Sequence, residues 1–249
     1  FNFYIFVSCN MHTFTLEKPI PKLKFYLRAI RGKMTLAKGE NIPHIQGTCT
    51  AKADPKAVAA YAQVCDFEIS DTLPITYPHI LAADLHYGLV THPAFSLKLI
   101  GLVHTQNTIT QHRALKVDET FTILGVEFDM HTQFKDETGA VVWEEVSTTL
   151  RRGGKPAKRA YQMAQASAVP KQLTQYMQFS APADIGRRYA KVSGDSNPIH
   201  TSNLGAKALG FPRAIAHGMW SKARCLAMYE GRLPHAFSVD VQFKLPMLL

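Results

Sequence analysis

An aspartate and a histidine lie five residues apart in the segment SGDSNPIH, which runs from Ser193 to His200. Asp195 and His200 flank a turn that Pro198 stiffens, because proline fixes its own φ and biases Asn197 towards an extended backbone. Asn197 can hydrogen-bond to nearby backbone and hold the turn. A carboxylate and an imidazole held together in this way can carry out general acid–base chemistry near neutral pH. An Asx turn followed by a helix-capping histidine would explain the same residues equally well.

A second segment whose residues could take part in catalysis is AHGMW, from Ala216 to Trp220. A glycine in the first turn of a helix leaves its N–H uncovered, and the helix dipole favours negative charge there. The N–H of Gly218 is therefore a candidate donor to a carbonyl oxygen that becomes an enolate. A glycine that only allows the helix to pack closely on a sheet is an equally good interpretation. His217 is interpreted as structural.

The elements that must position these residues follow a pattern that occurs twice. YAQVCD at Tyr61 and YAKVSGD at Tyr189 occupy matching places before a loop and a long helix. In the first copy the helices are expected over 53–66 and 78–95, followed by strands within 101–115, 119–139 and 140–153. In the second copy helices are expected within 180–195, 201–211 and 214–231, followed by one strand within 235–248. The pattern predicts two α+β domains, each with a long helix wrapped by an antiparallel sheet.

The chain is divided by its composition into four parts. We expect a basic lead-in over residues 1–45, a non-catalytic domain over 46–152, a basic linker over 153–172 and a catalytic domain over 173–249. Residues 1–10 are expected to be an artefact that precedes a true start at Met11. The second domain stops after one strand, and an open sheet edge is an aggregation hazard. We therefore expect this domain to be incomplete at its C-terminus.

The motif YAKVSGDSNPIHTS followed by GFPRAIAHGMW resembles the signature of the MaoC-like (R)-specific enoyl-CoA hydratases. The resemblance covers residues 174–249 and implies the hot-dog fold, hence a double hot-dog for the whole chain. It also implies that Asp195 and His200 form the catalytic dyad and that the Gly218 N–H polarises the thioester carbonyl. The residues that would support the site are Ser193, Asn197 and Pro198. The implied reaction is reversible addition of water to a trans-2-enoyl-CoA, which gives an (R)-3-hydroxyacyl-CoA.

The first copy departs from this signature. It reads CDFEISDTLP where the second reads SGDSNPIH, and YPHILAADL where the second reads AHGMW, so that Asp66 remains but N-P-x-H is absent. This resembles double hot-dog hydratases in which one half has lost catalysis and helps to accommodate the acyl chain. His79 is accordingly interpreted as structural, and a ligand role for His104 or His112 is not favoured.

The net charge of +9 and the pI of about 9.4 favour anionic partners. The phosphates of CoA would explain part of this charge, with Arg213 and Lys207 as weak candidates for contacts; an acyl-carrier-protein thioester is an alternative substrate. The implied reaction needs no metal and no redox cofactor. The four cysteines have no disulfide or zinc spacing, and no apolar run approaches the roughly 18–20 residues that span a bilayer. These features predict a cytoplasmic protein.

Other functions remain open at this point. Hot-dog acyl-CoA thioesterases also aim a helix N-terminus at the thioester carbonyl, although the N-P-x-H motif argues against hydrolysis. A non-catalytic acyl-thioester-binding protein and a nucleic-acid-binding protein are the non-enzymatic alternatives. The latter is suggested by charge alone, since no RNP-like aromatic motif accompanies it. Hot-dog domains usually pair through their sheets, so the two copies would form an internal pair, with or without a further homodimer.

Overall fold

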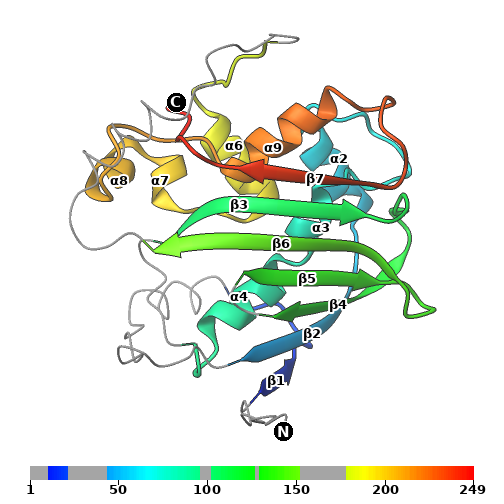
Figure 1. The fold of residues 1–249 in the computed structure, drawn as a ribbon. Coiled ribbons are helices and arrows are strands. Elements are labelled where there is room, and N and C mark those ends of the chain that lie inside the picture. Colours follow the sequence, from blue (N-terminus) through cyan, green and yellow to red (C-terminus); the bar gives the residue numbers. More distant parts are fainter. Residues whose placement is uncertain (1–10, 22–43, 96–101, 127–128, 152–177) are drawn as a thin grey trace, which may run out of the picture.

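The structure is a computed structural model that describes residues 11–21, 44–95, 102–126, 129–151 and 178–249. Its centre is a seven-stranded sheet in the order β1-β2-β4-β5-β6-β3-β7 (Figure 1). All neighbouring strands run antiparallel except β1 and β2, which are parallel. The strands are β1 (His12–Thr15), β2 (Ile45–Lys52), β3 (Leu102–Gln111), β4 (Thr120–Val126), β5 (Met130–Lys135), β6 (Val141–Arg151) and β7 (Phe237–Gln242).

The longer helices gather on one side of this sheet (Figure 1). The first half contributes α2 (Pro55–Cys65), α3 (Tyr77–Leu81) and α4 (Ala83–Thr91), and the second half contributes α6 (Ile185–Ser193), α7 (Pro198–Thr201), α8 (Asn203–Ala208) and α9 (Gly218–Ala227). The start of α2 follows the sequence prediction, because the Asp54 carboxylate accepts from the Lys56 N–H and Pro55 occupies the first turn.

The second half repeats part of the order of elements in the first, a set of helices followed by a strand. Helices α2 and α6 pack together, with the rings of Tyr61 and Tyr189 6.0 Å apart. Both helices end on a residue with positive φ, Asp66 at 66° and Gly194 at 79°. In each half a later helix leads into a strand, and these two strands, β3 and β7, pair antiparallel at the junction of the halves. The internal repeat predicted from the two tyrosines is therefore present in the structure.

The structure differs from the predicted elements in three places. The helix expected over 78–95 is divided into α3 and α4 at Ala82, and it ends at Thr91. The lead-in contributes strand β1, which no sequence pattern indicated. The second half adds its strand to the sheet of the first half, so the described residues form one continuous sheet. The predicted linker over 153–172, residues 1–10 and most of the basic lead-in lie outside the described residues.

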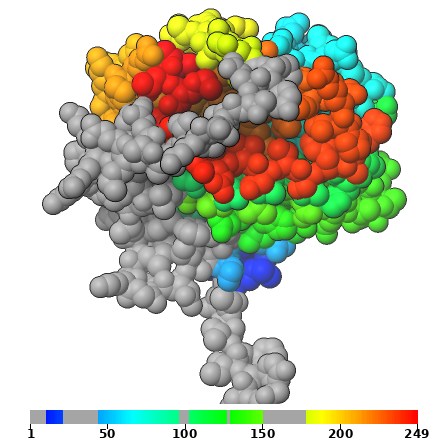
Figure 2. Space-filling model, turned by 45° about the horizontal axis from the view of Figure 1, so that its top comes forward, coloured from blue at the N-terminus to red at the C-terminus, as the bar shows by residue number. Residues whose placement is uncertain are grey.

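One hydrophobic core serves both halves. Buried side chains of the sheet, such as Phe121, Phe134 and Trp143, belong to the same cluster as Met219 and Trp220 of α9. The indole N–H of Trp220 also donates to the Val64 carbonyl of α2 at 3.1 Å. In the space-filling view the orange and red C-terminal region lies directly on the green strands (Figure 2). The second half is thus held in place by packing against the first.

Two further expectations concern the thiols and the membrane. Cys49, Cys65 and Cys225 are free, in agreement with the absence of a disulfide pattern, and Cys9 lies outside the described residues. Burial raises the pKa of the Cys49 thiol to about 11 and that of Cys65 to about 12. None of the described helices has the length and apolar character that a membrane span requires.

Candidate functional site

The turn after α6 presents Asp195. Gly194 caps the helix in the left-handed conformation, with φ of 79°, which glycine adopts without strain. Ser193 Oγ then accepts from the Asp195 N–H at 3.2 Å, and Asp195 Oδ1 accepts from the Asn197 N–H at 3.1 Å. One carboxylate oxygen therefore holds the turn, which leaves Oδ2 available for chemistry.

Helix α7 presents His200 in a fixed tautomer. Asn197 caps this helix by accepting from the Ile199 N–H at 3.3 Å, and Pro198 occupies its first position. His200 Nδ1 lies 2.8 Å from the Ile215 carbonyl oxygen, which can only accept a hydrogen bond. The proton of the neutral ring is therefore on Nδ1, and Nε2 carries the free lone pair.

His217 joins Asp195 and His200, although it was interpreted as merely structural. Its ring stacks on that of His200 with centroids 3.8 Å apart. Its Nε2 donates to the Asp195 backbone carbonyl at 3.0 Å and lies 3.7 Å from Asp195 Oδ2. One nitrogen or carboxylate oxygen from each of the three residues lies within 4.8 Å of the others. The same three residues are the described group that could each offer one ligand to a metal ion.

Gly218 begins α9 beside this group, as the sequence predicted. No described residue accepts a hydrogen bond from its N–H. A Cβ at this position would lie 3.0 to 3.2 Å from three atoms of the Phe243 ring. Glycine thus allows a close approach of the helix to the segment after β7 that a larger residue would disturb. The structure shows both features that the sequence left as alternatives, an uncovered N–H and a close contact.

Burial keeps the two histidines of the site neutral. Burial lowers the pKa of His200 below 6.5, outweighing the negative charge of Asp195 that raises it. Burial and the neighbouring His200 lower the pKa of His217 to about 4. Both rings are therefore neutral at pH 7, and the His200 lone pair is available to accept a proton.

The predicted CoA contacts lie on the surface. Arg213 precedes the buried Ala214–Ala216 segment, and Lys207 lies on α8; both side chains are exposed. Arg224, by contrast, forms an ion pair with Asp66 at 2.8 Å and lies over the Phe179 ring. A cavity of about 230 Å³ between α2 and residues 68–72 contains none of the predicted site residues.

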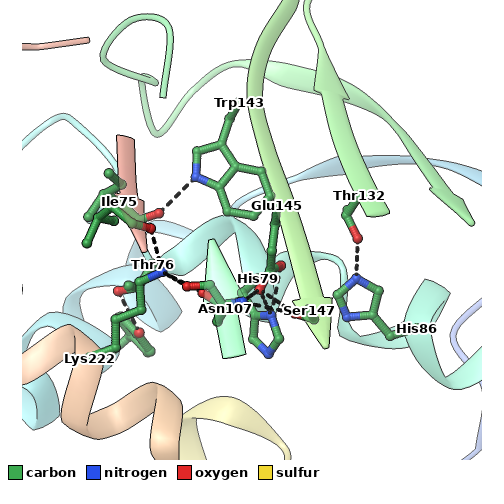
Figure 3. A network of polar contacts seen from close by, with 12 residues as sticks. Ile75, Thr76, His79, His86, Asn107, Thr132, Trp143, Glu145, Ser147 and Lys222 are labelled. Carbon is green, nitrogen blue, oxygen red and sulfur yellow. Dashed lines mark hydrogen bonds and ion pairs between the residues drawn. The ribbon is translucent and has the colours of Figure 1, made fainter. Parts of the chain in front are cut away.

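A buried polar network lies beneath β3 and β6 (Figure 3). His79 of α3 donates from Nδ1 to both oxygens of the Glu145 carboxylate, at 2.7 and 2.9 Å. Asn107 also donates to Glu145, and the Lys222 ammonium of α9 donates to Asn107 Oδ1 at 2.6 Å. The network therefore connects the central helices of the two halves. It was not predicted, because its members lie far apart in the sequence.

We expect the free energy of unfolding to decrease as the pH is lowered below 6.5. Burial lowers the pKa of His86 to about 3 and those of His104 and His217 to about 4. In the unfolded chain these imidazoles titrate near 6.5, so between pH 6.5 and 4 the unfolded state binds protons that the folded state does not. Each group should remove about 1.4 kcal/mol of unfolding free energy per pH unit across that window. Urea unfolding at a series of pH values measures this; a flat profile would contradict the buried neutral histidines.

Comparisons with known proteins agree with this fold. A sheet packed on a central helix, with an aspartate–histidine pair at the helix N-terminus, places the protein among the hot-dog proteins. The MaoC like domain matches residues 157–245. The 3-hydroxyacyl-thioester dehydratase X of Mycobacterium tuberculosis is 34% identical over 91% of this chain and 85% of that protein. The chain belongs to the MaoC-like dehydratase family.

Solved structures show the same relationship. The crystal structure of HtdX of Mycobacterium tuberculosis is 33% identical, with a TM-score of 0.66 over 81% of this chain and 84% of that chain. A MaoC-like dehydratase from Phytophthora capsici has a TM-score of 0.57 at 19% identity, covering 82% of each chain. At that identity the likeness shows the fold alone.

Proposed function

We propose that the protein catalyses the reversible, (R)-specific interconversion of trans-2-enoyl and 3-hydroxyacyl thioesters. Asp195 and His200 form the acid–base dyad, and the Gly218 N–H stabilises the thioester oxygen. The observation that carries this proposal is the meeting of three groups: a carboxylate oxygen, a neutral imidazole and an uncovered helix N-terminus. Membership of the MaoC-like dehydratase family and a relative named 3-hydroxyacyl-thioester dehydratase support it.

The dyad activates water in the hydration direction. His200 Nε2 accepts a proton from a water molecule whose oxygen attacks C3 of the enoyl group. Asp195 Oδ2 accepts the water's other hydrogen bond and stabilises the imidazolium that forms. The spacing within 4.8 Å allows one water to contact both groups. The imidazolium then returns the proton to C2, so that H and OH have been added across the double bond.

The start of α9 stabilises the charge that develops during this addition. As the water oxygen attacks C3, electrons move onto the thioester oxygen and an enolate forms. The Gly218 N–H and the positive end of the α9 dipole favour that charge. The close contact of Gly218 with Phe243 fixes the donor in position. Dehydration uses the same groups in reverse.

The proposal also includes the partners and the compartment. Exposed Arg213 and Lys207 are proposed to contact the phosphates of CoA, or the acidic surface of an acyl-carrier protein. Free thiols favour a reducing compartment, which would be the cytoplasm. A homodimer in addition to the internal pair of halves remains a prediction.

Hydration of crotonyl-CoA tests the proposal directly. We expect loss of the enoyl absorbance without release of free thiol, and formation of (R)-3-hydroxybutyryl-CoA on a chiral column. Release of free CoA would instead indicate a thioesterase. Binding of the thioester without either change would indicate a non-catalytic acyl-thioester-binding protein.

His217 is expected to position the dyad. Replacing His217 by Ala removes the ring that stacks on His200 and the donor to the Asp195 carbonyl. We expect kcat to fall by about tenfold or more with a smaller change in KM, since small misplacements of catalytic groups are costly. His217→Gln, whose amide can still donate to that carbonyl, should recover part of the activity. Equal kcat values in both variants and the wild type would show that His217 has no positioning role.

A further inference from the structure

The inner face of the first-half sheet changes from apolar to polar along its strands. Trp143, Glu145 and Ser147 alternate along the inner face of β6, and Ile109 and Asn107 do so on β3. The apolar members pack in the core, whereas the polar ones face α3 and α9. Polar side chains therefore occupy the part of the first half that is nearest to the catalytic helix α9.

The carboxylate of Glu145 has all its hydrogen-bond partners within this part of the interior. Its side chain is 0% exposed, and it accepts from His79, from Asn107 and from Ser147 Oγ at 2.9 Å. Lys222 is similarly occupied by Asn107 and by the Val239 carbonyl. Neither charged group can bind another molecule without losing these bonds. Their role is to hold the network together (Figure 3).

His79 is the member of this network with a ring nitrogen, Nε2, that the network does not use. Burial lowers its pKa, but the charge and hydrogen bond of Glu145 outweigh burial and raise it above 6.5. When Glu145 holds the ring in its protonated form, Nδ1–H lies on Glu145 and Nε2 carries a second N–H. Among the described residues none accepts from Nε2, and the side chain is 22% exposed. His79 thus offers a partly exposed Nε2–H that is not used within the network.

Ring contacts connect His79 to the start of α9, which carries the proposed oxyanion donor. The ring of His104 lies 6.3 Å from that of His79 and 5.1 Å from that of Phe243, which contacts Gly218. His104 Nε2 is itself buried without a partner. His79 therefore lies on the first-half side of the site, where the acyl group would extend.

We propose that His79, held by Glu145, binds an oxygen atom on the acyl group of the substrate. The preferred thioesters would carry a hydroxyl, keto or carboxylate oxygen beyond C3, rather than a plain alkyl chain. The inference rests on the proposed function of the dyad and adds a specificity-determining position to it. The first half would then contribute a charged hydrogen-bond donor as well as shape.

The physical reason is the cost of leaving a charged donor unpaired. An alkyl chain against His79 Nε2 would displace water from an imidazolium N–H and offer no acceptor in return. An oxygen in the same place restores a charge-assisted hydrogen bond. Sites built to hydrogen-bond a substrate group discriminate strongly against analogues that lack it. We therefore expect an oxygen preference of about tenfold or more in kcat/KM.

The test compares enoyl-CoA substrates of matched chain length that are plain, ω-hydroxylated or ω-carboxylated. In the wild type we expect the ratio of kcat/KM, oxygenated over plain, to reach about tenfold or more at one chain length. His79→Leu should reduce this ratio to about one, and His79→Gln, which keeps a neutral donor, should retain part of it. His112→Leu is the matched control, because His112 pairs with Glu144 at 3.2 Å but is exposed. It should leave the ratio unchanged.

The outcomes separate this inference from the proposed function. Hydration of plain enoyl-CoA with no oxygen preference at any chain length would overturn the role of His79 and leave the dyad intact. Equal losses on plain and oxygenated substrates in His79→Leu would also overturn it, because the bound oxygen would then belong to the shared CoA portion. If His79→Leu does not fold by circular dichroism, Glu145→Gln provides the test, since it should lower the preference for the carboxylate. No turnover of any thioester by the wild type would instead refute the proposed function.

Discussion

Asp195→Asn is expected to lower kcat for crotonyl-CoA hydration by about 10²–10⁴-fold, the usual contribution of general acid–base catalysis. The amide cannot stabilise the His200 imidazolium as a charged carboxylate does. The turn should survive, because an amide oxygen can still accept from the Asn197 N–H as Oδ1 does now. Steady-state kinetics together with a thermal melt would measure both effects.

The matched control for this variant is Asp184→Asn. Asp184 precedes α6 in the same half, is exposed and makes no side-chain capping bond. The control should retain wild-type kcat, and both variants should unfold within a few degrees of the wild type. His200→Gln should resemble Asp195→Asn, and the double variant should be little worse than either, because the two act as a unit. Wild-type activity in Asp195→Asn would remove the dyad assignment.

The part of the site that could be predicted from the sequence is local. Asn197 and Pro198 determine the turn through their own backbone preferences, and a stretch of eight residues contains both Asp195 and His200. Gly218 could be placed at a helix start because the pattern of apolar residues begins there. The equivalence of Tyr61 and Tyr189 was visible because the repeat keeps similar residues at matching places.

The features that were not predicted depend on contacts between distant segments. His217 stacks on His200 only because the 211–217 segment returns alongside α7, where the Ile215 N–H donates to the Ile199 carbonyl. Glu145 and His79 are 66 residues apart, and no period or spacing connects them. Strand β1 is short and pairs at the edge of the sheet, so its residues carry no alternation that would reveal it.

The polar network gives the first half a role beyond the one that its sequence predicted. From the sequence it was a copy that had lost its catalytic motif and contributed only shape. In the structure Lys222, which lies one helical turn after Gly218 on α9, donates to Asn107 of β3. The first half therefore contacts and fixes the helix that carries the proposed oxyanion donor. Although the first half lacks the catalytic motif, it still affects the proposed site through its contacts with α9.

Gly218→Ala is expected to lower kcat by about 10²–10³-fold, the cost of losing one oxyanion donor. The added Cβ would lie 3.0 to 3.2 Å from the Phe243 ring, which is closer than two carbons pack without adjustment. The Phe243 backbone is held by its N–H bond to the Thr105 carbonyl at 2.8 Å, so we expect part of the adjustment to fall on the start of α9. The N–H remains chemically present but points away from the thioester oxygen. KM should change less than kcat, because the loss is confined to the transition state.

A second substitution separates this steric effect from a general loss of folding. Phe243→Leu removes the ring atoms that meet the new Cβ, so the double variant Gly218→Ala/Phe243→Leu should recover part of the kcat that Gly218→Ala loses. Phe243→Leu alone is the control and should cost less than Gly218→Ala, since it leaves the helix start free to stay in place. A wild-type kcat in Gly218→Ala would mean that oxygen stabilisation does not depend on this close approach. Recovery in the double variant would show that the position of the α9 N-terminus, rather than the identity of residue 218, is what catalysis requires.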